Sequence, residues 1–275
     1  VLFQFSLQLF SQEASFQNEV FSSDVHSIQI HQKDWELSPP IYELNSTQTL
    51  LLEFDIITTD APQLQYKITH CTRYWTESDL LPQQYLTGFE DGYISEFEYS
   101  FNTWTPYVHY MQEFPNPNMQ FTQSGNYIIN VFREDDNEPL FSARIVVVEN
   151  IVPISAKAKR SDEVFNRDRL HEIDFTANVQ GVQLNSPSSN VTACILQNNR
   201  WDNAIENLRP AFTGNQQLMF DYTKENSFPA GNEYRYLNLK SLQFPGERVH
   251  SINDETDTIK VALKLDPMRN QVYSY

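Results

Sequence analysis

Short segments in which apolar and polar residues alternate recur along the whole chain, and they constrain its fold most strongly. Residues 25–30 and 50–57 alternate with a period of two, as side chains on opposite faces of a strand do. Runs with the 3.6-residue period of a helix are nearly absent, and Pro, Asn, Asp, Ser or Gly separate the segments. The pattern therefore predicts an all-β chain, with one short helix at 75–85 capped by Thr76 or Ser78.

The aromatic-rich stretch 68–132 indicates which β architecture to expect. A Ser-Gly-Asn turn at 124–126 leads into a strand whose first side chain is Tyr127. In immunoglobulin-like sandwiches such a tyrosine often forms a corner, with its hydroxyl bonded to the upstream backbone. The turn and its tyrosine therefore predict a β-sandwich.

The segment 105–114 is predicted to be an interior strand. Tyr107, His109 and Met111 fall on one face, and Val108 and Tyr110 fall on the other. Aromatic residues on both faces indicate that both faces are at least partly covered. Such a strand lies inside a sheet and not at its edge.

A chain of 275 residues is long enough for two domains of ordinary size. We expect two tandem immunoglobulin-like sandwiches, at 25–150 and 151–275. The segment 157–162 loses apolar periodicity and is locally basic, so it is expected to be a linker or a long loop near the boundary. The second part has few strands, so it is predicted to be incomplete at its carboxyl end.

Residues 1–24 are interpreted as the remnant of a signal peptide followed by a polar lead. About ten apolar residues precede Ser11 and Gln12, which is too short for a membrane span. An amphipathic first strand at 2–9 is the alternative. The signal-peptide interpretation predicts an exported protein.

The charge balance excludes two classes of partner. The net charge is −17 and the pI is about 4.6. Binding to nucleic acid depends on Lys and Arg, as does binding to anionic lipid. We therefore expect neither nucleic-acid binding nor insertion into a membrane.

No catalytic, cofactor or metal site is predicted. His70 and Cys71 are neighbours in a strand, so they point to opposite faces and cannot act as a base and nucleophile pair. The six histidines lack metal-ligand spacing, and the acidic turns at 134–138 and 253–257 lack the glycine and closing Glu of a calcium loop. Cys71 and Cys194 are expected to be two buried, unbridged thiols.

One polar constellation suggests either a structural network or a binding surface. It comprises the segments 197–203 and 231–235, which are rich in amides and contain two arginines and a tryptophan. Such groups can hold a loop in place, and Trp and Arg are also common interface anchors. The residues predicted to bind a partner are Arg200, Trp201, Asp202, Asn203, Glu233 and Arg235.

Several ordered motifs resemble the plug protein family of the type IX secretion system. The resemblance runs from about Val25 to the end, although that family continues beyond Tyr275. The motifs are LNSTQTLLLEFD at 44–55, ITHCTRYWTESDL at 68–80, YLTGF at 85–89, SFNTWTPYVHY at 100–110, SGNYIINVF at 124–132, QNNRWDNAI at 197–205 and AGNEYRYLNL at 230–239.

The resemblance implies a non-enzymatic accessory protein in the periplasm. Proteins of that family sit beneath an outer-membrane β-barrel translocon and close its periplasmic opening when no cargo passes. The family has no assigned active site, so the resemblance implies no catalytic residue. It implies the translocon barrel as the partner, and association with the outer membrane through that partner.

Two other functions remain open from the residues alone. A carbohydrate-binding sandwich is suggested by the four Trp and many Tyr, and it would need exposed, coplanar aromatic rings. A hydrolase is the weaker alternative. It would need a concave pocket with paired carboxylates.

Overall fold

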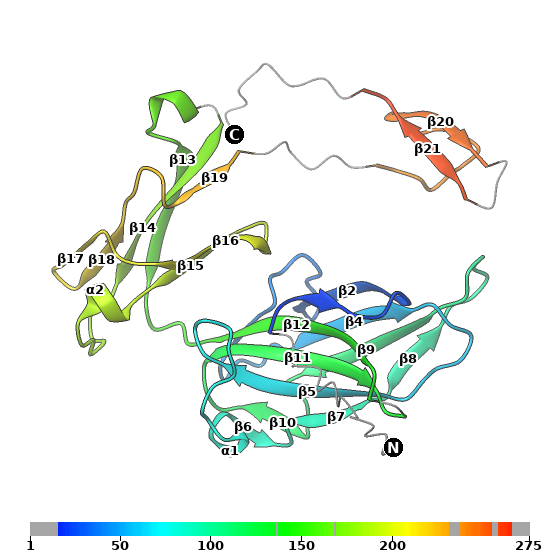
Figure 1. Ribbon diagram of the computed structural model, residues 1–275, viewed down its shortest axis with the longest axis horizontal. Coiled ribbons are helices and arrows are strands. Elements are labelled where there is room, and N and C mark those ends of the chain that lie inside the picture. Colours follow the sequence, from blue (N-terminus) through cyan, green and yellow to red (C-terminus); the bar gives the residue numbers. More distant parts are fainter. Residues whose placement is uncertain (1–15, 136, 168, 231–236, 255–257, 266–275) are drawn as a thin grey trace, which may run out of the picture. The chain divides into compact units, whose positions relative to one another are not determined.

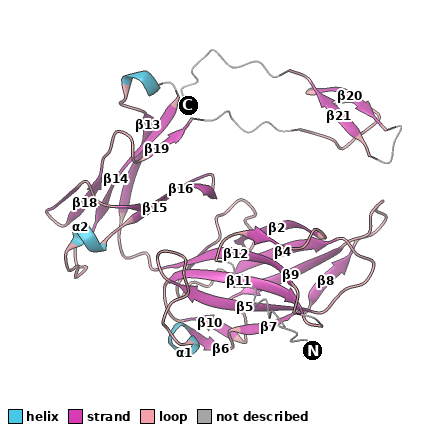
Figure 2. Cartoon of the chain, in the orientation of Figure 1, coloured by secondary structure: helices cyan, strands magenta, loops and turns pink. Residues whose placement is uncertain are grey.

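The computed structural model describes residues 16–135, 137–167, 169–230, 237–254 and 258–265. Strands dominate these residues, and the described helices are short (Figure 2). The all-β sandwich prediction is confirmed. Contacts group the chain into two compact units, residues 1–159 with 173–226 and residues 160–172 with 227–275. The predicted domain boundary at 150 stays a prediction.

Two sheets form the sandwich in the first unit (Figure 1). One has the order β1-β12-β11-β5-β7. The short strand β3 pairs in parallel with β12, at the opposite end of β12 from β1. The other has the order β2-β4-β9-β8. The strands of the first sheet are β1 (Glu19–Val20), β3 (Ile41–Glu43), β5 (Leu64–Cys71), β7 (Asp91–Ile94), β11 (Gly125–Arg133) and β12 (Pro139–Val148). Those of the second are β2 (Val25–Gln32), β4 (Leu50–Ile56), β8 (Glu96–Tyr99) and β9 (Val108–Phe114).

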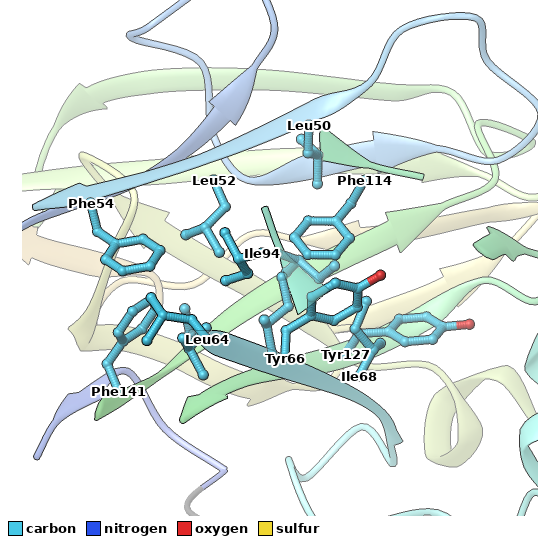
Figure 3. Packing of buried hydrophobic residues seen from close by; sticks show 14 of the residues in the cluster. Leu50, Leu52, Phe54, Leu64, Tyr66, Ile68, Ile94, Phe114, Tyr127 and Phe141 are labelled. Atoms are coloured by element: carbon cyan, nitrogen blue, oxygen red, sulfur yellow. The ribbon is translucent and has the colours of Figure 1, made fainter. Parts of the chain in front are cut away.

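The core lies between the two sheets, where the period-two pattern places the apolar side chains. In β4, Leu50, Leu52, Phe54 and Ile56 are fully buried, and the residues between them are partly exposed. Figure 3 shows Leu50, Leu52 and Phe54 facing side chains of the opposite sheet. One of these is Phe141, whose ring centroid lies 4.9 Å from that of Phe54. Burying one such side chain contributes about 1.5–3 kcal/mol. Alternation in the sequence therefore accounts for the main source of stability.

The tyrosine corner predicted at Tyr127 is confirmed. Its side chain is fully buried, and its hydroxyl donates to the carbonyl oxygen of Gln123 at 2.6 Å. The strand β11 starts at Gly125, whose φ of 154° lies in the region that favours glycine. The corner therefore fixes how the chain enters the central strand of its sheet.

The strand predicted at 105–114 is interior, as expected. It is β9, and it pairs with β4 on one side and with β8 on the other. Residues 91–99 form two strands, because β7 belongs to one sheet and β8 to the other. The chain crosses between the sheets at Ser95.

Two local predictions differ from the structure. The helix expected at 75–85 is limited to α1 (Pro82–Tyr85), because a tight turn at 72–76 and a bridge from Cys71 to Glu77 occupy the preceding residues. The expected linker at 157–162 lies largely in β13 (Ile154–Arg160), a mostly exposed strand beside β14. Its low apolar content reflects this exposure and not a loss of structure.

Beyond the sandwich, the first unit contains a second and smaller core. Leu208, Leu218 and Phe220 are its largest buried members. The elements around it are β14 (Leu170–Asn178), α2 (Pro187–Asn190), β15 (Ala193–Gln197), β16 (Arg200–Leu208), β17 (Phe212–Gly214) and β18 (Gln217–Phe220), together with β13. A separate two-stranded antiparallel sheet pairs β6 (Leu86–Gly88) with β10 (Met119–Phe121).

The second unit is built from short pieces. Residues 170–172 of β14 pair with β19 (Ser227–Pro229), close in sequence to the 3-10 turn η1 (Val164–Asn166). The strands β20 (Val249–Asn253) and β21 (Lys260–Leu263) form a hairpin, in which Val249 is buried.

Candidate partner-binding site

The predicted polar constellation forms the turn of the β15–β16 hairpin. Asn198 and Asn199 have φ angles of 57° and 59°, as the primed turn of a two-residue hairpin loop requires. Gln197 pairs with Arg200 across the turn, and Asn203 donates from Nδ2 to the side-chain oxygen of Gln197 at 3.0 Å. These bonds form a network that holds the turn in place.

Arg200 and Asp202 form an ion pair on the surface of this hairpin. Arg200 Nε donates to Asp202 Oδ1 at 2.9 Å, and a second guanidinium nitrogen pairs with Oδ2. The hydrogen bond from Arg200 lowers the pKa of the Asp202 carboxyl. Because both side chains are more than half exposed, at 54% and 63%, the pair contributes little to stability. Glu233 and Arg235 lie outside the described residues. The role in partner binding predicted for Arg200, Trp201, Asp202, Asn203, Glu233 and Arg235 stays a prediction.

Trp201 contacts the sandwich and does not stand free in solvent. Its ring meets that of Trp75 edge to face, with centroids 4.9 Å apart and an interplanar angle of 81°. The Arg144 guanidinium lies over both rings, 4.2 Å from the centroid of Trp75 and 4.9 Å from that of Trp201. An edge-to-face contact contributes about 0.5–1.5 kcal/mol, and a cation–π contact with a partly buried cation contributes about 0.5–2 kcal/mol. Trp201 therefore has a structural role in this unit, whatever it binds.

Arg144 is fixed in the stack by further contacts. Its Nε donates to the carbonyl oxygen of Phe16 at 2.9 Å, and its backbone N–H donates to Asn18 Oδ1 at 2.7 Å. Burial lowers the pKa of the Arg144 guanidinium from its ordinary value, which Glu206 partly offsets. Trp75 is held in the left-handed region, with φ of 58°, by the turn that follows β5. Such a conformation is costly for a bulky residue, so the surrounding contacts determine where the ring lies.

His70 and Cys71 do not form a catalytic pair. The His70 ring packs edge on against Tyr127 at 4.9 Å, and its Nδ1 lies 2.8 Å from Ser78 Oγ. Cys71 is buried in a separate cluster with Trp75. Burial raises the pKa of the Cys71 thiol to about 12, so the thiolate that nucleophilic catalysis needs is scarce at neutral pH.

The prediction for the cysteines is correct for Cys71 and wrong for Cys194. Both are free thiols, but Cys194 is exposed. Its neighbours Ala193 and Ile195 in β15 pack against the small core. Because alternate residues of a strand face opposite sides, Cys194 faces away from that core.

A chain of two histidines and two carboxylates, which sequence reasoning missed, crosses the outer face of the β2-β4-β9 sheet. Glu53 Oε2 lies 2.8 Å from His31 Nε2, and its other oxygen lies 3.5 Å from His109 Nε2. His109 Nδ1 in turn lies 2.8 Å from Asp55. The only sign in the sequence was the i, i+2 spacing of the two acids on β4. Strand register brings together histidines that are far apart in the chain.

His31 is the most buried member of this chain of groups, at 3% exposed. Burial by itself lowers its pKa, but bonds to the Gln32 carbonyl and to Glu53 outweigh this effect and raise the pKa above 6.5. The contacts of His31 therefore favour its protonated form relative to a free histidine.

An open hollow of about 990 Å³ lies at one end of the sandwich. Tyr66, Phe89 and Tyr93 line it together with Asn116, Asn118 and the acidic residues Asp91, Glu96 and Glu113. Glu113 is already paired with Lys33 and accepts a bond from Thr49. The hollow is therefore lined by aromatic and acidic side chains, and Glu96 at the start of β8 is one of them.

The edge strand β8 presents a second uncovered surface. Phe97 and Tyr99 are 42% and 58% exposed, and the loop that follows holds Phe101 and Trp104 at 93% and 104%.

In the described part of the chain, no helix is both long and apolar enough to cross a bilayer. The strand order defines the class of this protein as an all-β sandwich.

The sandwich also matches a known protein family. Residues 25–149 match the family described as Type 9 secretion system plug protein 1st domain. This confirms the resemblance over these residues and associates the chain with the type 9 secretion system.

A solved structure extends the similarity over most of the chain. It is a hypothetical protein from Parabacteroides merdae ATCC 43184, with a TM-score of 0.86 and 29% identity, covering 96% of this chain and 67% of the other. A Pseudomonas fluorescens alkylpurine DNA glycosylase bound to DNA matches with a TM-score of only 0.26 and 13% identity, over 45% of this chain and 30% of the other. This similarity is too weak to indicate a shared fold or function. No curated protein matches the sequence.

Proposed function

We propose that the protein is a non-enzymatic accessory component of the type 9 secretion system that closes the periplasmic opening of the outer-membrane translocon barrel. The match of residues 25–149 to the first domain of a plug protein carries this proposal. In it the protein works in the periplasm, and a protein partner holds it at the outer membrane.

The physical properties of the sandwich support this role. A plug must keep its shape against a large opening, and a close-packed core resists deformation. Both sheets contribute fully buried aromatic rings to that core, including Phe54, Tyr110, Tyr127 and Phe141. The net charge of −17 disfavours direct adsorption to anionic lipid, which is consistent with attachment through a protein.

Carbohydrate binding has less support in the structure. A sugar ring stacks on flat, exposed aromatic platforms. Trp35 and Trp104 are exposed, so burial of the tryptophans does not rule this function out. The exposed neighbours Phe97 and Tyr99, however, stand at 88° to each other, which offers no such platform.

Co-purification tests the association. An affinity-tagged full-length protein is isolated from detergent-solubilised outer membranes of the encoding organism, and its partners are identified by mass spectrometry. We expect enrichment of the translocon barrel. The matched control is Phe54→Asp, which places an unpaired charge in the core at a fully buried position and should abolish the interaction by unfolding. A barrel that is absent from the wild-type sample would refute the association.

Outer-membrane permeability tests the closure. Deleting the gene should leave a translocon opening unblocked, so cells should become sensitive to an antibiotic too large for porins. Deleting the barrel gene as well should restore resistance. Unchanged sensitivity in the single deletion, together with intact co-purification, would show that the protein binds the barrel without closing it.

A further inference from the structure

A ladder of aromatic rings leaves the core and emerges at the edge strand β8. From the buried Phe141 it passes to Phe54 at 4.9 Å, to Tyr110 at 5.3 Å, to Phe97 at 5.7 Å and to Tyr99 at a further 5.7 Å. The first three rings are fully buried, and the last two are about half exposed. The packed interior thus continues into an uncovered apolar surface.

The outer edge of β8 has no pairing strand within the described residues. Among the described strands, β8 pairs with β9 alone. The Ser100 N–H donates to the Tyr107 carbonyl, and this bond shows which residues of the strand direct their backbone groups toward β9. In antiparallel pairing every second residue bonds to the partner strand, so the N–H and C=O groups of Phe97 and Tyr99 point away from β9. An open edge of this kind is a template for an added strand.

The β8–β9 loop extends the same surface with two large side chains. Phe101 and Trp104 are almost fully exposed, at 93% and 104%. The loop is nevertheless ordered, because Ser100 Oγ accepts the Tyr107 N–H at 2.9 Å and lies 3.0 Å from Thr103 Oγ1. The aromatic side chains are therefore presented by a structured turn, which lowers the entropy cost of binding.

Charge indicates what kind of segment fits this edge. Residues 74–132 contain no Lys or Arg, and both Glu96 and Glu98 on β8 are exposed. A complementary segment therefore carries Lys or Arg opposite these glutamates and apolar side chains opposite Phe97 and Tyr99. A second copy of this chain would bring glutamates against glutamates, and an anionic lipid surface would repel them.

We propose that β8 and the β8–β9 loop are the docking edge for an extended segment of the translocon barrel that bears Lys or Arg and apolar residues. The segment adds as a strand beside β8, and Phe101 and Trp104 anchor it. This inference rests on the proposed function and specifies the surface that performs it.

Photo-cross-linking in the encoding organism locates the contact. The full-length protein carries Trp104→p-benzoylphenylalanine, and the matched control is Phe165→p-benzoylphenylalanine, at an aromatic residue that is 92% exposed on the second unit. We expect an adduct that contains the barrel from position 104 and none from position 165. No adduct from position 104, equal adducts from both, or an adduct with a second copy or with lipid would overturn the proposal.

A matched pair of substitutions isolates the added strand. Tyr99→Ala and Tyr99→Pro both remove the ring, but only the proline removes the outward N–H, and proline is tolerated on an edge strand. Thermal unfolding first shows that both variants fold. We expect Tyr99→Pro to capture about fivefold less barrel than Tyr99→Ala, as the loss of one backbone hydrogen bond implies. Equal capture would overturn strand addition, whereas failure of the wild-type protein to capture the barrel would refute the proposed function itself.

Discussion

Trp201→Ala should destabilise the first unit by an amount that its ring contacts determine. The substitution removes an edge-to-face contact with Trp75 and a cation–π contact with Arg144. The ring contact contributes about 0.5–1.5 kcal/mol, and the cation–π contact about 0.5–2 kcal/mol because the guanidinium is partly buried. We therefore expect a loss of about 1–3.5 kcal/mol, at or below the lower end of the roughly 3–5 kcal/mol of a fully buried aromatic residue.

Urea unfolding of the full-length chain measures this loss, with near-ultraviolet circular dichroism as the probe. The matched control is Trp104→Ala, because Trp104 is the same residue type at full exposure. It should change the unfolding free energy by less than about 0.5 kcal/mol. A double-mutant cycle with Arg144→Met should give a coupling energy of about 0.5–2 kcal/mol between positions 144 and 201.

Two results would refute this reasoning about the ring stack. Equal losses for the two tryptophan variants would mean that the contacts of Trp201 do not stabilise the fold. A coupling energy near zero would mean that the guanidinium and the indole do not interact in solution. In either case the predicted role of Trp201 as an exposed anchor for a partner would gain support.

Three further outcomes follow from the sandwich. Tyr127→Phe removes the buried corner hydroxyl and its hydrogen bond to the Gln123 carbonyl, so it should cost about 0.5–1.5 kcal/mol of unfolding free energy; unchanged urea midpoints would contradict this. Gly125→Ala should cost about 1–3 kcal/mol, because a Cβ there would lie 2.4 Å from Nε2 of His70, and a variant as stable as wild type would show that the ring moves aside. The raised pKa of His31 means that its bond to Glu53 stabilises the fold fully below pH 6.5 and that this contribution is lost as pH rises through the folded-state pKa. Unfolding free energies across this range should therefore fall with pH more steeply in the wild type than in His31→Gln, and equal slopes would refute the assignment.

Local patterns were sufficient to predict the strands of the sandwich. The alternation at 50–57 corresponds to β4, and the turn before Tyr127 corresponds to the tyrosine corner. The failures lie where local pattern and tertiary context disagree. Most of β13 was expected to be a linker because exposed strands carry few apolar residues, and the helix expected at 75–85 is limited to α1 because a turn and a bridge take up the residues before it.

The candidate sites show the same division. The amide-rich turn at 197–203 could be recognised as a network, because its members are neighbours in the chain. Nothing in the sequence placed Trp201 against Trp75 and Arg144, or His31 beside Glu53. Those contacts depend on strand order and register, which join segments more than twenty residues apart.

By itself, the sequence determined that this chain is built of strands with an apolar inner face, because the two-residue period is a property of each segment alone. It also carried the family resemblance. Only the tertiary structure decided which aromatic residues are covered, because burial depends on whether another sheet lies opposite. Phe54 and Phe97 belong to one continuous ladder of rings, yet the first is sealed in the core and the second reaches solvent at the open edge of β8.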